Sequence, residues 1–285
     1  MKILIVGSTS VIGRALAEFL TSQGVEVKLA GRRDADIFFD LSVLDAPPAI
    51  NEQFDAVVHV AADFGGSTDQ DYIRAEMVNA SGTFSACSLA HSVKARHFVL
   101  LSSVFSTYSS RDPYYGIYAL TKRHSEEAAQ YYCAERGMDL TVLRPSQVYD
   151  DAALCRPHQE FLYMIADKAQ AGQSVEVYGS HDALRNYIHL SDLTEIIKRV
   201  LQERVAGVFT CANTQSVKLS EMAGAAYRAF DTADKGNVVF WPDRQDLLDL
   251  PPIHDFDLYS RIQYQPRVGI EEGYRRIKLH RETYS

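Results

Sequence analysis

A tyrosine and a lysine four residues apart are the side chains whose types and spacing point most directly to chemistry. Tyr118 and Lys122 lie near the start of a segment with helical periodicity that continues to about Tyr132, and residues i and i+4 share one helix face. A nearby ammonium group favours the phenolate and lowers the tyrosine pKa from its usual value of about 10. Such a tyrosine can donate a proton to a carbonyl oxygen or accept one from an alcohol. Because this region is rich in tyrosine, helix packing is the alternative interpretation.

A pair of serines follows the apolar run that precedes this helix. His97 to Leu101 predicts a buried strand, and Ser102 and Ser103 come directly after it. A hydroxyl at the end of such a strand can hold the oxygen atom on which the tyrosine acts. The order of the parts therefore favours a site with a hydroxyl, a phenol and an ammonium group. Ser103 is the expected hydroxyl, and Ser102 is the alternative if the register differs by one.

A glycine turn between a strand and a helix forms the first stretch of the chain. Ile3 to Val6 is an unbroken apolar run with β-branched residues, as expected of a strand buried on both faces of a parallel sheet. Gly7 breaks the run, and Gly13 opens a segment of helical periodicity. This order forms the unit that holds a dinucleotide pyrophosphate through backbone N–H groups and a helix N-terminus. The turn has Ser10 where a further glycine is usual, and a glycine turn alone is a weak signal.

The end of the second expected strand, Val25 to Ala30, bears on the choice of cofactor. A carboxylate at this position accepts hydrogen bonds from a ribose 2′-hydroxyl, whereas arginine favours a 2′-phosphate. Here Gly31 takes the position of the carboxylate, and Arg32 and Arg33 follow it. The sequence therefore predicts NADP(H) rather than NAD(H), with exposed arginines in a solvated turn as the alternative.

Further strands alternate with helices through the first half of the chain. The expected segments are a short strand at Phe38–Leu41, a strand at Ala56–Ala62, a helix at Asn79–Val93 with the apolar positions Phe84, Cys87, Leu89 and Ala90, and strands at His97–Leu101 and Asp139–Leu143. This alternation predicts an α/β fold with a Rossmann-type doubly wound parallel sheet. Asp40 could accept a hydrogen bond from an adenine amino group or belong to a turn, and His59 is interpreted as a core histidine.

The composition is that of a globular protein and excludes several classes of function. Of the 285 residues, 46% are hydrophobic and 23% are charged, and the net charge of −8 argues against a nucleic-acid-binding surface. No apolar run is long enough to predict a membrane span or a signal peptide. The four cysteines are widely scattered without metal or redox spacing, which predicts reduced thiols, a cytoplasmic protein and no metal site.

Several further segments carry a resemblance to a known family. They are Val57–Ala62, Val78–Thr83, Leu143–Tyr149, Arg185–Asp192 and Arg267–Gly273. With them, the chain resembles the extended short-chain dehydrogenases/reductases of the NAD(P)-dependent epimerase/dehydratase family, which act mostly on nucleotide sugars. The segments extend over nearly the whole chain, so the resemblance is specific for the family and much less so for the reaction.

The resemblance implies a role for each candidate site residue. Tyr118 would be the acid/base, Lys122 would lower its pKa and hold the nicotinamide ribose, and Ser103 would position the reacting oxygen. The other cofactor contacts would be Gly7, Thr9, Ser10, Val11, Ile12 and Gly13 at the pyrophosphate, Asp40 and Leu41 at the adenine, Ala61 and Ala62 beside the cofactor, and Pro145 and Ser146 near the nicotinamide. Gln147 and Arg185 would join Ser103 in contacting the substrate, Arg185 through its diphosphate. The alternative is that Arg185 is a surface arginine.

The resemblance also implies two domains and a small set of reactions. We expect a cofactor domain of residues 1–145 and 185–202, a substrate domain of residues 146–184 and 203–285, an active site between them and a homodimer. The segment after Ser103 lacks the Asp–Glu pair that the family's 4,6-dehydratases carry, which argues against dehydration. The preferred function is an NADP(H)-dependent reductase of a keto group on a nucleotide-linked deoxysugar. A nucleotide-sugar epimerase, a reductase of a small non-sugar carbonyl and a non-catalytic NADP(H)-binding sensor are the alternatives.

Overall fold

The computed structural model describes residues 1–43, 47–251 and 253–284, and the chain divides into two units that are described separately. The first unit comprises Met1–Pro145, Thr194–Thr210 and Asp257–Gln263, and the second comprises the segments between and after these. Compared with the expected domains, residues 185–193 fall in the second unit, whereas residues 203–210 and 257–263 fall in the first.

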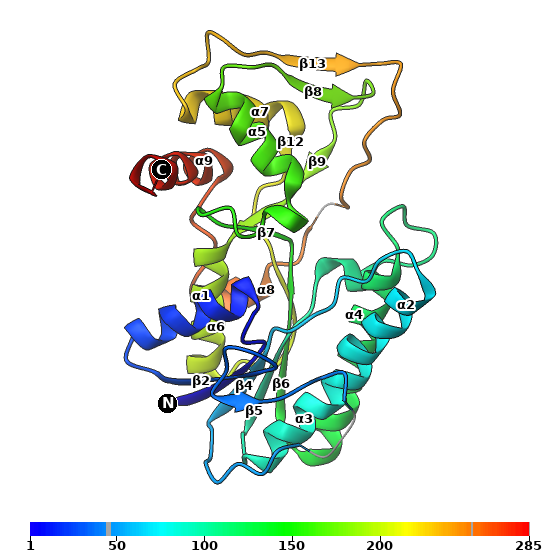
Figure 1. Cartoon of the computed structure of the whole chain (residues 1–285), viewed down its shortest axis with the longest axis vertical. Coiled ribbons are helices and arrows are strands. Elements are labelled where there is room, and N and C mark those ends of the chain that lie inside the picture. Colours follow the sequence, from blue (N-terminus) through cyan, green and yellow to red (C-terminus); the bar gives the residue numbers. More distant parts are fainter. Residues whose placement is uncertain (44–46, 252, 285) are drawn as a thin grey trace. The chain divides into compact units, whose positions relative to one another are not determined.

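One seven-stranded sheet organises the first unit (Figure 1). Its strands are β1 (Lys2–Val6), β2 (Glu26–Gly31), β3 (Ile37–Phe38), β4 (Ala56–His59), β5 (His97–Leu101), β6 (Asp139–Pro145) and β11 (Gly207–Cys211). They lie in the order β11-β6-β5-β4-β1-β2-β3, and each neighbouring pair from β6 to β3 is parallel. The strand order reverses between β1 and β4, as it does in doubly wound folds. The predicted fold class is thereby confirmed.

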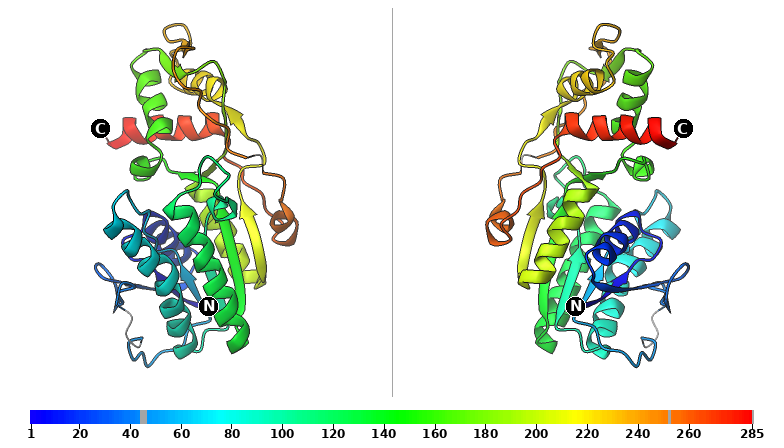
Figure 2. Two further views of the ribbon diagram at one scale, coloured as in Figure 1. Left: turned by 90° about the vertical axis from the view of Figure 1, so that its right-hand side faces the viewer. Right: turned by 90° about the vertical axis from the view of Figure 1, so that its left-hand side faces the viewer.

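Helices cover both faces of this sheet. They are α1 (Val11–Ser22), α2 (Asp69–Glu76), α3 (Gly82–Ser92), α4 (Ile117–Arg136), α6 (Leu190–Glu203) and the short α8 (Asp257–Arg261). Figure 2 shows α1 and α6 over one face and α2, α3 and α4 over the other. Because neither face is left to water, the inner strands β1, β4 and β5 are buried along almost their whole length.

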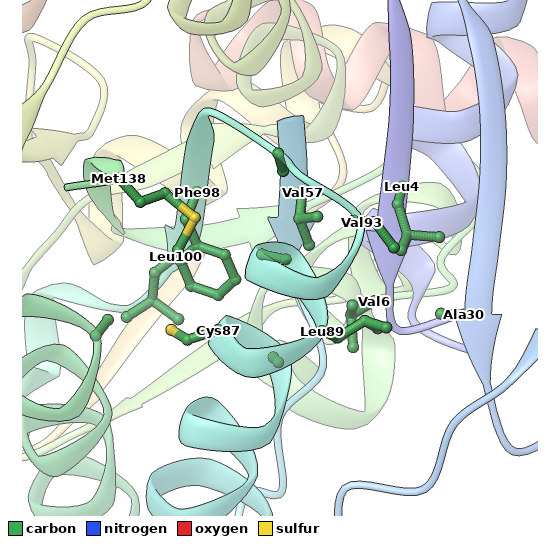
Figure 3. Packing of buried hydrophobic residues seen from close by; sticks show 14 of the residues in the cluster. Leu4, Val6, Ala30, Val57, Cys87, Leu89, Val93, Phe98, Leu100 and Met138 are labelled. Carbon is green, nitrogen blue, oxygen red and sulfur yellow. The ribbon is translucent and has the colours of Figure 1, made fainter. Parts of the chain in front are cut away.

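The core between the sheet and α3 is formed by aliphatic and aromatic side chains (Figure 3). Leu4, Val57 and Phe98 of the strands pack with Leu89 and other residues of the helix. The helix buries a face of small and aliphatic residues, namely Gly82, Thr83, Ala86, Cys87, Leu89 and Ala90. Phe84, one of the apolar positions named for the expected helix, is 43% exposed because it points away from this face.

The helix expected at Asn79–Val93 is part of a longer helical stretch. Its first part, α2, is polar and was not predicted; Thr68 and Asp71 cap it by exchanging hydrogen bonds between side chains and backbone N–H groups. A π-helical turn, η1 (Met77–Ser81), then connects α2 to α3. The turn directs Asn79 inward, where its side chain accepts from Asp63 N at 2.8 Å and donates to Thr121 Oγ1 at 2.9 Å.

Short strand pairs and packed helices build the second unit. Its elements are β7 (Gln147–Tyr149), the 3-10 turn η3 (Arg156–His158), α5 (Glu160–Gln170), β8 (Val175–Tyr178), β9 (Leu184–Arg185), β10 (Tyr187–His189), β12 (Val217–Lys218), α7 (Leu219–Ala229), β13 (Val238–Trp241) and α9 (Ile270–Tyr284). Strand β7 pairs with β10, β9 with β12 and β8 with β13, while α7 packs against α5 and α9. Gly273 lets α9 approach Tyr149, because a Cβ there would lie 2.1 Å from the tyrosine hydroxyl.

Candidate active site

The glycine turn after β1 is shaped by two residues that cannot carry a side chain. Gly7 has φ +127°, and a Cβ on it would lie 2.8 Å from Val60 Cγ2 and 2.9 Å from Ala61 N. A Cβ on Gly13 would lie 2.5 Å from the Gly7 carbonyl oxygen. Both glycines are therefore required for the close passage of the backbone. The first turn of α1 contains no acidic residue, so the bare N–H groups and the helix N-terminus fit a pyrophosphate.

Ser10 is the N-cap of α1, which accounts for the departure from the usual glycine. Its φ of −68° and ψ of 135° are open to any residue, and its Oγ accepts a hydrogen bond from Gly13 N at 3.3 Å. Serine at an N-cap typically stabilises a helix by about 1 kcal/mol relative to alanine. The turn thus keeps glycine at the two positions that require it, and Ser10 between them serves as the cap of the helix.

The end of β2 has no room for a carboxylate. A Cβ on Gly31 would lie 2.1 Å from Ser8 Oγ, which donates to the Arg33 carbonyl at 2.6 Å. Against the effect of burial, hydrogen bonds from Ser42 and the charge of Arg32 hold the pKa of Asp40 below its usual value. Asp40 belongs to a turn after β3, where it accepts from Ser42 N at 2.9 Å. The local structure therefore agrees with the turn interpretation of this aspartate.

Arg14 is a further cation at this place that the sequence analysis did not single out. Its Nε donates to the Ser8 carbonyl at 3.1 Å, and its Nη2 lies 2.8 Å from Asp34 Oδ2. The guanidinium thus joins the glycine turn to the loop that carries Arg32 and Arg33. Its position directly after Gly13 was the only signal in the sequence.

The residues expected beside the cofactor lie close to these turns. Ala61 N donates to the Val6 carbonyl at 3.1 Å, next to Gly7, and Ala62 follows it. Leu41 is buried against Gly82, whose Cβ would lie 2.9 Å from Leu41 Cβ. Thr9, Val11 and Ile12 stand between the two glycines of the turn.

Ser103 is brought to the phenol of Tyr118, and Ser102 is not. Tyr118 is the second residue of α4, and its side chain shares a hydrogen bond with the side chain of Ser103. The Ser103 Oγ also accepts from Phe105 N at 3.3 Å. The hydroxyl of Ser102 instead donates to the carboxylate of Glu126. Of the two registers considered for the strand end, the one with Ser103 at the site is therefore present.

Aromatic rings surround the phenol. Phe64, which is 48% exposed, stacks on Tyr118 with the ring centroids 4.7 Å apart and the planes 11° apart. Phe105 meets the same ring edge-on at 6.5 Å. Neither phenylalanine was predicted, because a single aromatic residue in a loop gives no periodic signal. Burial raises the pKa of Tyr118 to about 12, although the hydrogen bond with Ser103 acts in the opposite direction.

In this structure the ammonium group of Lys122 is not directed at the phenol oxygen of Tyr118. The Lys122 Nζ lies 6.0 Å from the centroid of the tyrosine ring and donates to the Leu101 carbonyl at 2.7 Å. The ammonium is therefore directed to the end of β5 rather than to the phenol oxygen. Burial lowers the pKa of Lys122 to about 8, against the charge of Glu126, which raises it. A phenol with a raised pKa close to a buried lysine with a lowered pKa is typical of sites that transfer protons.

The last predicted contacts lie at the end of β6 and in the second unit. Pro145 closes β6, and the hydroxyl of Ser146 is buried and has no hydrogen-bond partner among the described residues. Gln147 donates from Nε2 to Gln159 Oε1 at 3.0 Å. The Oε1 of Gln147 is buried and also has no hydrogen-bond partner among the residues that the structure describes. Such unpaired polar atoms are typical of ligand sites. Arg185 Nη1 donates to the Leu248 carbonyl at 2.7 Å, so that a loop carbonyl orients its guanidinium.

Two further observations bear on the class of the protein. Within the described residues, every helix is too short or too polar to cross a membrane. The four cysteines, Cys87, Cys133, Cys155 and Cys211, are free and buried.

Comparisons with known proteins identify the family of the chain. The model of the NAD dependent epimerase/dehydratase family matches residues 3–212. A dTDP-4-dehydro-6-deoxy-D-allose reductase from a Streptomyces species is 28% identical over 173 residues, which are 58% of this chain and 51% of the relative. The match therefore spans about half the length of that relative.

Solved structures share the fold over the whole chain. RMD from Pseudomonas aeruginosa, complexed with NADPH, has a TM-score of 0.78 at 18% identity and covers 100% of this chain and 99% of its own. UDP-glucose 4-epimerase from Thermus thermophilus, complexed with NAD, has a TM-score of 0.75 at 19% identity and covers 100% of both chains. Since the family model covers most of the sequence, the chain belongs to the NAD dependent epimerase/dehydratase family.

Proposed function

We propose that the chain is an NADP(H)-dependent reductase of a keto group on a nucleotide-linked deoxysugar. The observation that supports this most directly is the hydrogen bond between Ser103 and Tyr118 at the end of β5, with Lys122 one helical turn further along α4. In this proposal the first unit binds the cofactor, and the second unit binds most of the substrate. Gln147 and Arg185 are the proposed substrate contacts of the second unit.

The protonation state of the site suits the reductive direction. A phenol with a pKa of about 12 is protonated at neutral pH, so Tyr118 is ready to donate a proton to the oxygen of a keto group. Ser103 donates a hydrogen bond to the same oxygen and fixes its position. When bound, the nicotinamide supplies the hydride to the carbon. In this proposal Lys122, as an ammonium, would hold the ribose hydroxyls of a bound cofactor and would stabilise the tyrosinate that proton donation leaves behind.

Two features support the choice of a deoxysugar. The Streptomyces relative carries the name of a reductase for a dTDP-linked 4-dehydro-6-deoxysugar. Phe64 and Phe105 line the phenol with aromatic surface, and such surface suits the apolar side of a sugar that lacks a hydroxyl. A small non-sugar carbonyl compound carries no diphosphate. That alternative is therefore favoured if Arg185 does not contact the substrate.

The preference for NADP(H) rests on the end of β2. Gly31 cannot be exchanged for an acidic residue while Ser8 Oγ stands 2.1 Å from the position of its Cβ, and Arg32 and Arg33 follow it. We expect Arg32→Ala to weaken NADPH binding at least tenfold, the loss of one good charge-assisted contact, and NADH binding much less. Arg96→Ala removes an exposed arginine at the start of β5 and is the matched control. Equal weakening of both cofactors would refute the preference.

A nucleotide-sugar epimerase is the second candidate, because a UDP-glucose 4-epimerase shares the fold over the full chain. The experiment that separates the two incubates the protein with NADPH and a panel of nucleotide-linked 4-keto-6-deoxysugars. Consumption of NADPH, followed by absorbance, supports the reductase. Isomerisation of a nucleotide sugar without consumption supports the epimerase, and silence with every substrate refutes both. Tyr118→Phe should abolish turnover while NADPH binding is kept, and this would also exclude a non-catalytic sensor.

We also propose that the chain forms a homodimer through the helices that cover one sheet face of the first unit. Large apolar side chains are exposed there, on α2, α3 and α4: Tyr72 at 44%, Ile73 at 54%, Phe84 at 43% and Tyr131 at 66%. Exposed apolar side chains gathered on neighbouring helices are typical of interfaces. Ile73→Glu should convert the dimer to a monomer in sedimentation experiments, whereas Leu279→Glu on α9 should not. A wild-type chain that is monomeric at tens of micromolar contradicts the proposal.

A further inference from the structure

A buried carboxylate lies between the end of β5 and the helix that carries Tyr118. Glu126 is four residues after Lys122 on α4 and is 3% exposed. A carboxylate out of water costs several kcal/mol unless charged and hydrogen-bonding partners surround it. The groups that surround the Glu126 carboxylate therefore indicate why it is buried.

Glu126 is held by two hydroxyls and one guanidinium. Ser102 donates to its Oε1, and Ser106 Oγ lies 2.6 Å from the same oxygen. Arg144 of β6 reaches it from the other side, with Nε 3.0 Å from Oε1 and Nη2 2.5 Å from Oε2. Against the effect of burial, Arg144 and the two serines hold the pKa of Glu126 below its usual value. The carboxylate is therefore charged at neutral pH.

The same bonds connect the strand end to the catalytic helix. Ser102 directly precedes Ser103, and Ser106 Oγ also lies 2.8 Å from the Ser103 carbonyl oxygen. Ser106 belongs to η2 (Val104–Thr107), the 3-10 turn that follows Ser103. Glu126 thus ties both sides of Ser103 to the helix that presents Tyr118 and Lys122.

The charges that face Lys122 can be named element by element. From β4, His59 is buried and its pKa is lowered to about 3, mainly by burial and further by the charge of Lys122, so it is neutral at pH 7. From β5, Leu101 offers a carbonyl oxygen only. On α4 itself, Tyr118 is neutral at pH 7 and Glu126 is an anion. Arg144 of β6 is paired with that anion, so the negative charge acting on Lys122 is that of Glu126.

We propose that Glu126 is a positioning residue that keeps Lys122 in its ammonium form and fixes Ser103 to the helix of Tyr118. The proposal rests on the proposed function, because it assigns Glu126 a part in the chemistry of these three residues. Glu126 itself touches no reacting atom: it acts through Lys122 by charge and through Ser103 by the bonds of Ser102 and Ser106.

The test follows the titration of Lys122 in the full chain without cofactor or substrate. Lysine labelled with ¹³C at Cε gives one signal for each residue, and the signal that Lys122→Arg removes is that of Lys122. In Glu126→Gln, we expect the titration midpoint of Lys122 to fall by about one pKa unit or more, the usual effect of losing a close opposite charge. Glu127→Gln is the matched control, because it removes the same charge from the next position, which is exposed. It should leave the midpoint unchanged.

A second variant covers the case in which Glu126→Gln fails to fold. Glu126→Gln combined with Arg144→Met leaves no unpaired guanidinium, and removing both partners of a buried ion pair is often tolerated. The midpoint of Lys122 should still fall, since the charge of Glu126, one helical turn further along α4, raises the pKa of Lys122. An unchanged midpoint in either folded variant overturns the proposal. The titration uses no substrate, so it can be carried out even if the chain is inactive with every sugar. A failure of the proposed function and a failure of the Glu126 proposal can therefore be distinguished.

Discussion

Replacing Lys122 by methionine should make the protein more stable at neutral pH and remove its function. The side chain is 3% exposed, and burial lowers its pKa from 10.5 to about 8. At about 1.36 kcal/mol per pKa unit, the difference corresponds to about 3 kcal/mol by which the buried ammonium destabilises the fold below pH 8. The hydrogen bond from Nζ to the Leu101 carbonyl is lost in Lys122→Met, which costs about 1 kcal/mol. We therefore expect a net gain of about 2 kcal/mol at pH 7.

The pH dependence gives the sharper signature. The folded chain releases the Lys122 proton near pH 8, whereas the unfolded chain keeps it until 10.5. Between these two values the unfolded state carries the Lys122 proton and the folded state does not, so Lys122 contributes a rise of the free energy of unfolding with pH. Below pH 8 both states carry the proton, and the contribution of Lys122 is constant. In Lys122→Met the rise between pH 8 and pH 10 should be absent.

Urea unfolding followed by far-UV circular dichroism at pH 7 and pH 10 measures both effects. Lys94→Met removes an exposed lysine of the same unit and should leave the pH dependence of the wild type unchanged. The reasoning is refuted if the free energy of unfolding changes between pH 8 and pH 10 by the same amount in the wild type and in Lys122→Met, or if Lys122→Met is less stable than the wild type at pH 7. Turnover of Lys122→Met should fall to background, which sets stability against function at this position.

Three further changes test other parts of the structure. Arg14→Ala should weaken NADPH binding in calorimetry by about tenfold, because the guanidinium that ties the Ser8 carbonyl to the loop after β2 is lost; an unchanged affinity would show that the loop needs no such tie. Gly273→Ala should destabilise the second unit by about 2 kcal/mol, since the new Cβ would lie 2.1 Å from the hydroxyl of Tyr149; urea unfolding measures it, and a neutral result would mean that α9 can shift freely. In His59→Leu, the free energy of unfolding should fall less than in the wild type as the pH is lowered from 6.5 to about 3. The reason is that the folded state keeps this histidine neutral in that range, while the unfolded state is protonated. A fall as steep as that of the wild type would contradict this.

The sheet could be predicted because its strands are buried on both faces. Such strands are continuous apolar runs, and the run from His97 to Leu101 has the same bounds as β5. The prediction was weaker where polar residues form regular structure. Helix α2 is polar along most of its length and is fixed by a cap at Thr68 and by Asn79 from the π-helical turn. The contact of Asn79 with Asp63 is tertiary, and the cap is a local Thr-x-x-Asp motif that carries no hydrophobic period.

The candidate site shows the same division between local and tertiary information. The spacing of Tyr118 and Lys122 and the strand end at Ser103 were sufficient to predict which side chains gather. The direction of Lys122 was not predictable, because it depends on the carbonyl of Leu101, which only the fold places within 2.7 Å. Glu126 could have been found, since it continues the same helix face one turn beyond Lys122. Phe64 could not, because its contact with Tyr118 arises from a loop.

The surroundings of Tyr118 keep its phenol in the protonated form. A general acid must be protonated at the operating pH and a general base deprotonated, and either works best when its pKa lies near that pH. Tyr118, with a pKa of about 12, meets the first condition and not the second. A reductase needs only the donated proton, whereas an epimerase needs the same group to accept a proton and return it within one turnover. The surroundings of the phenol, from Phe64 on one side to the Ser103 hydroxyl on the other, therefore leave Tyr118 in the form that donates a proton.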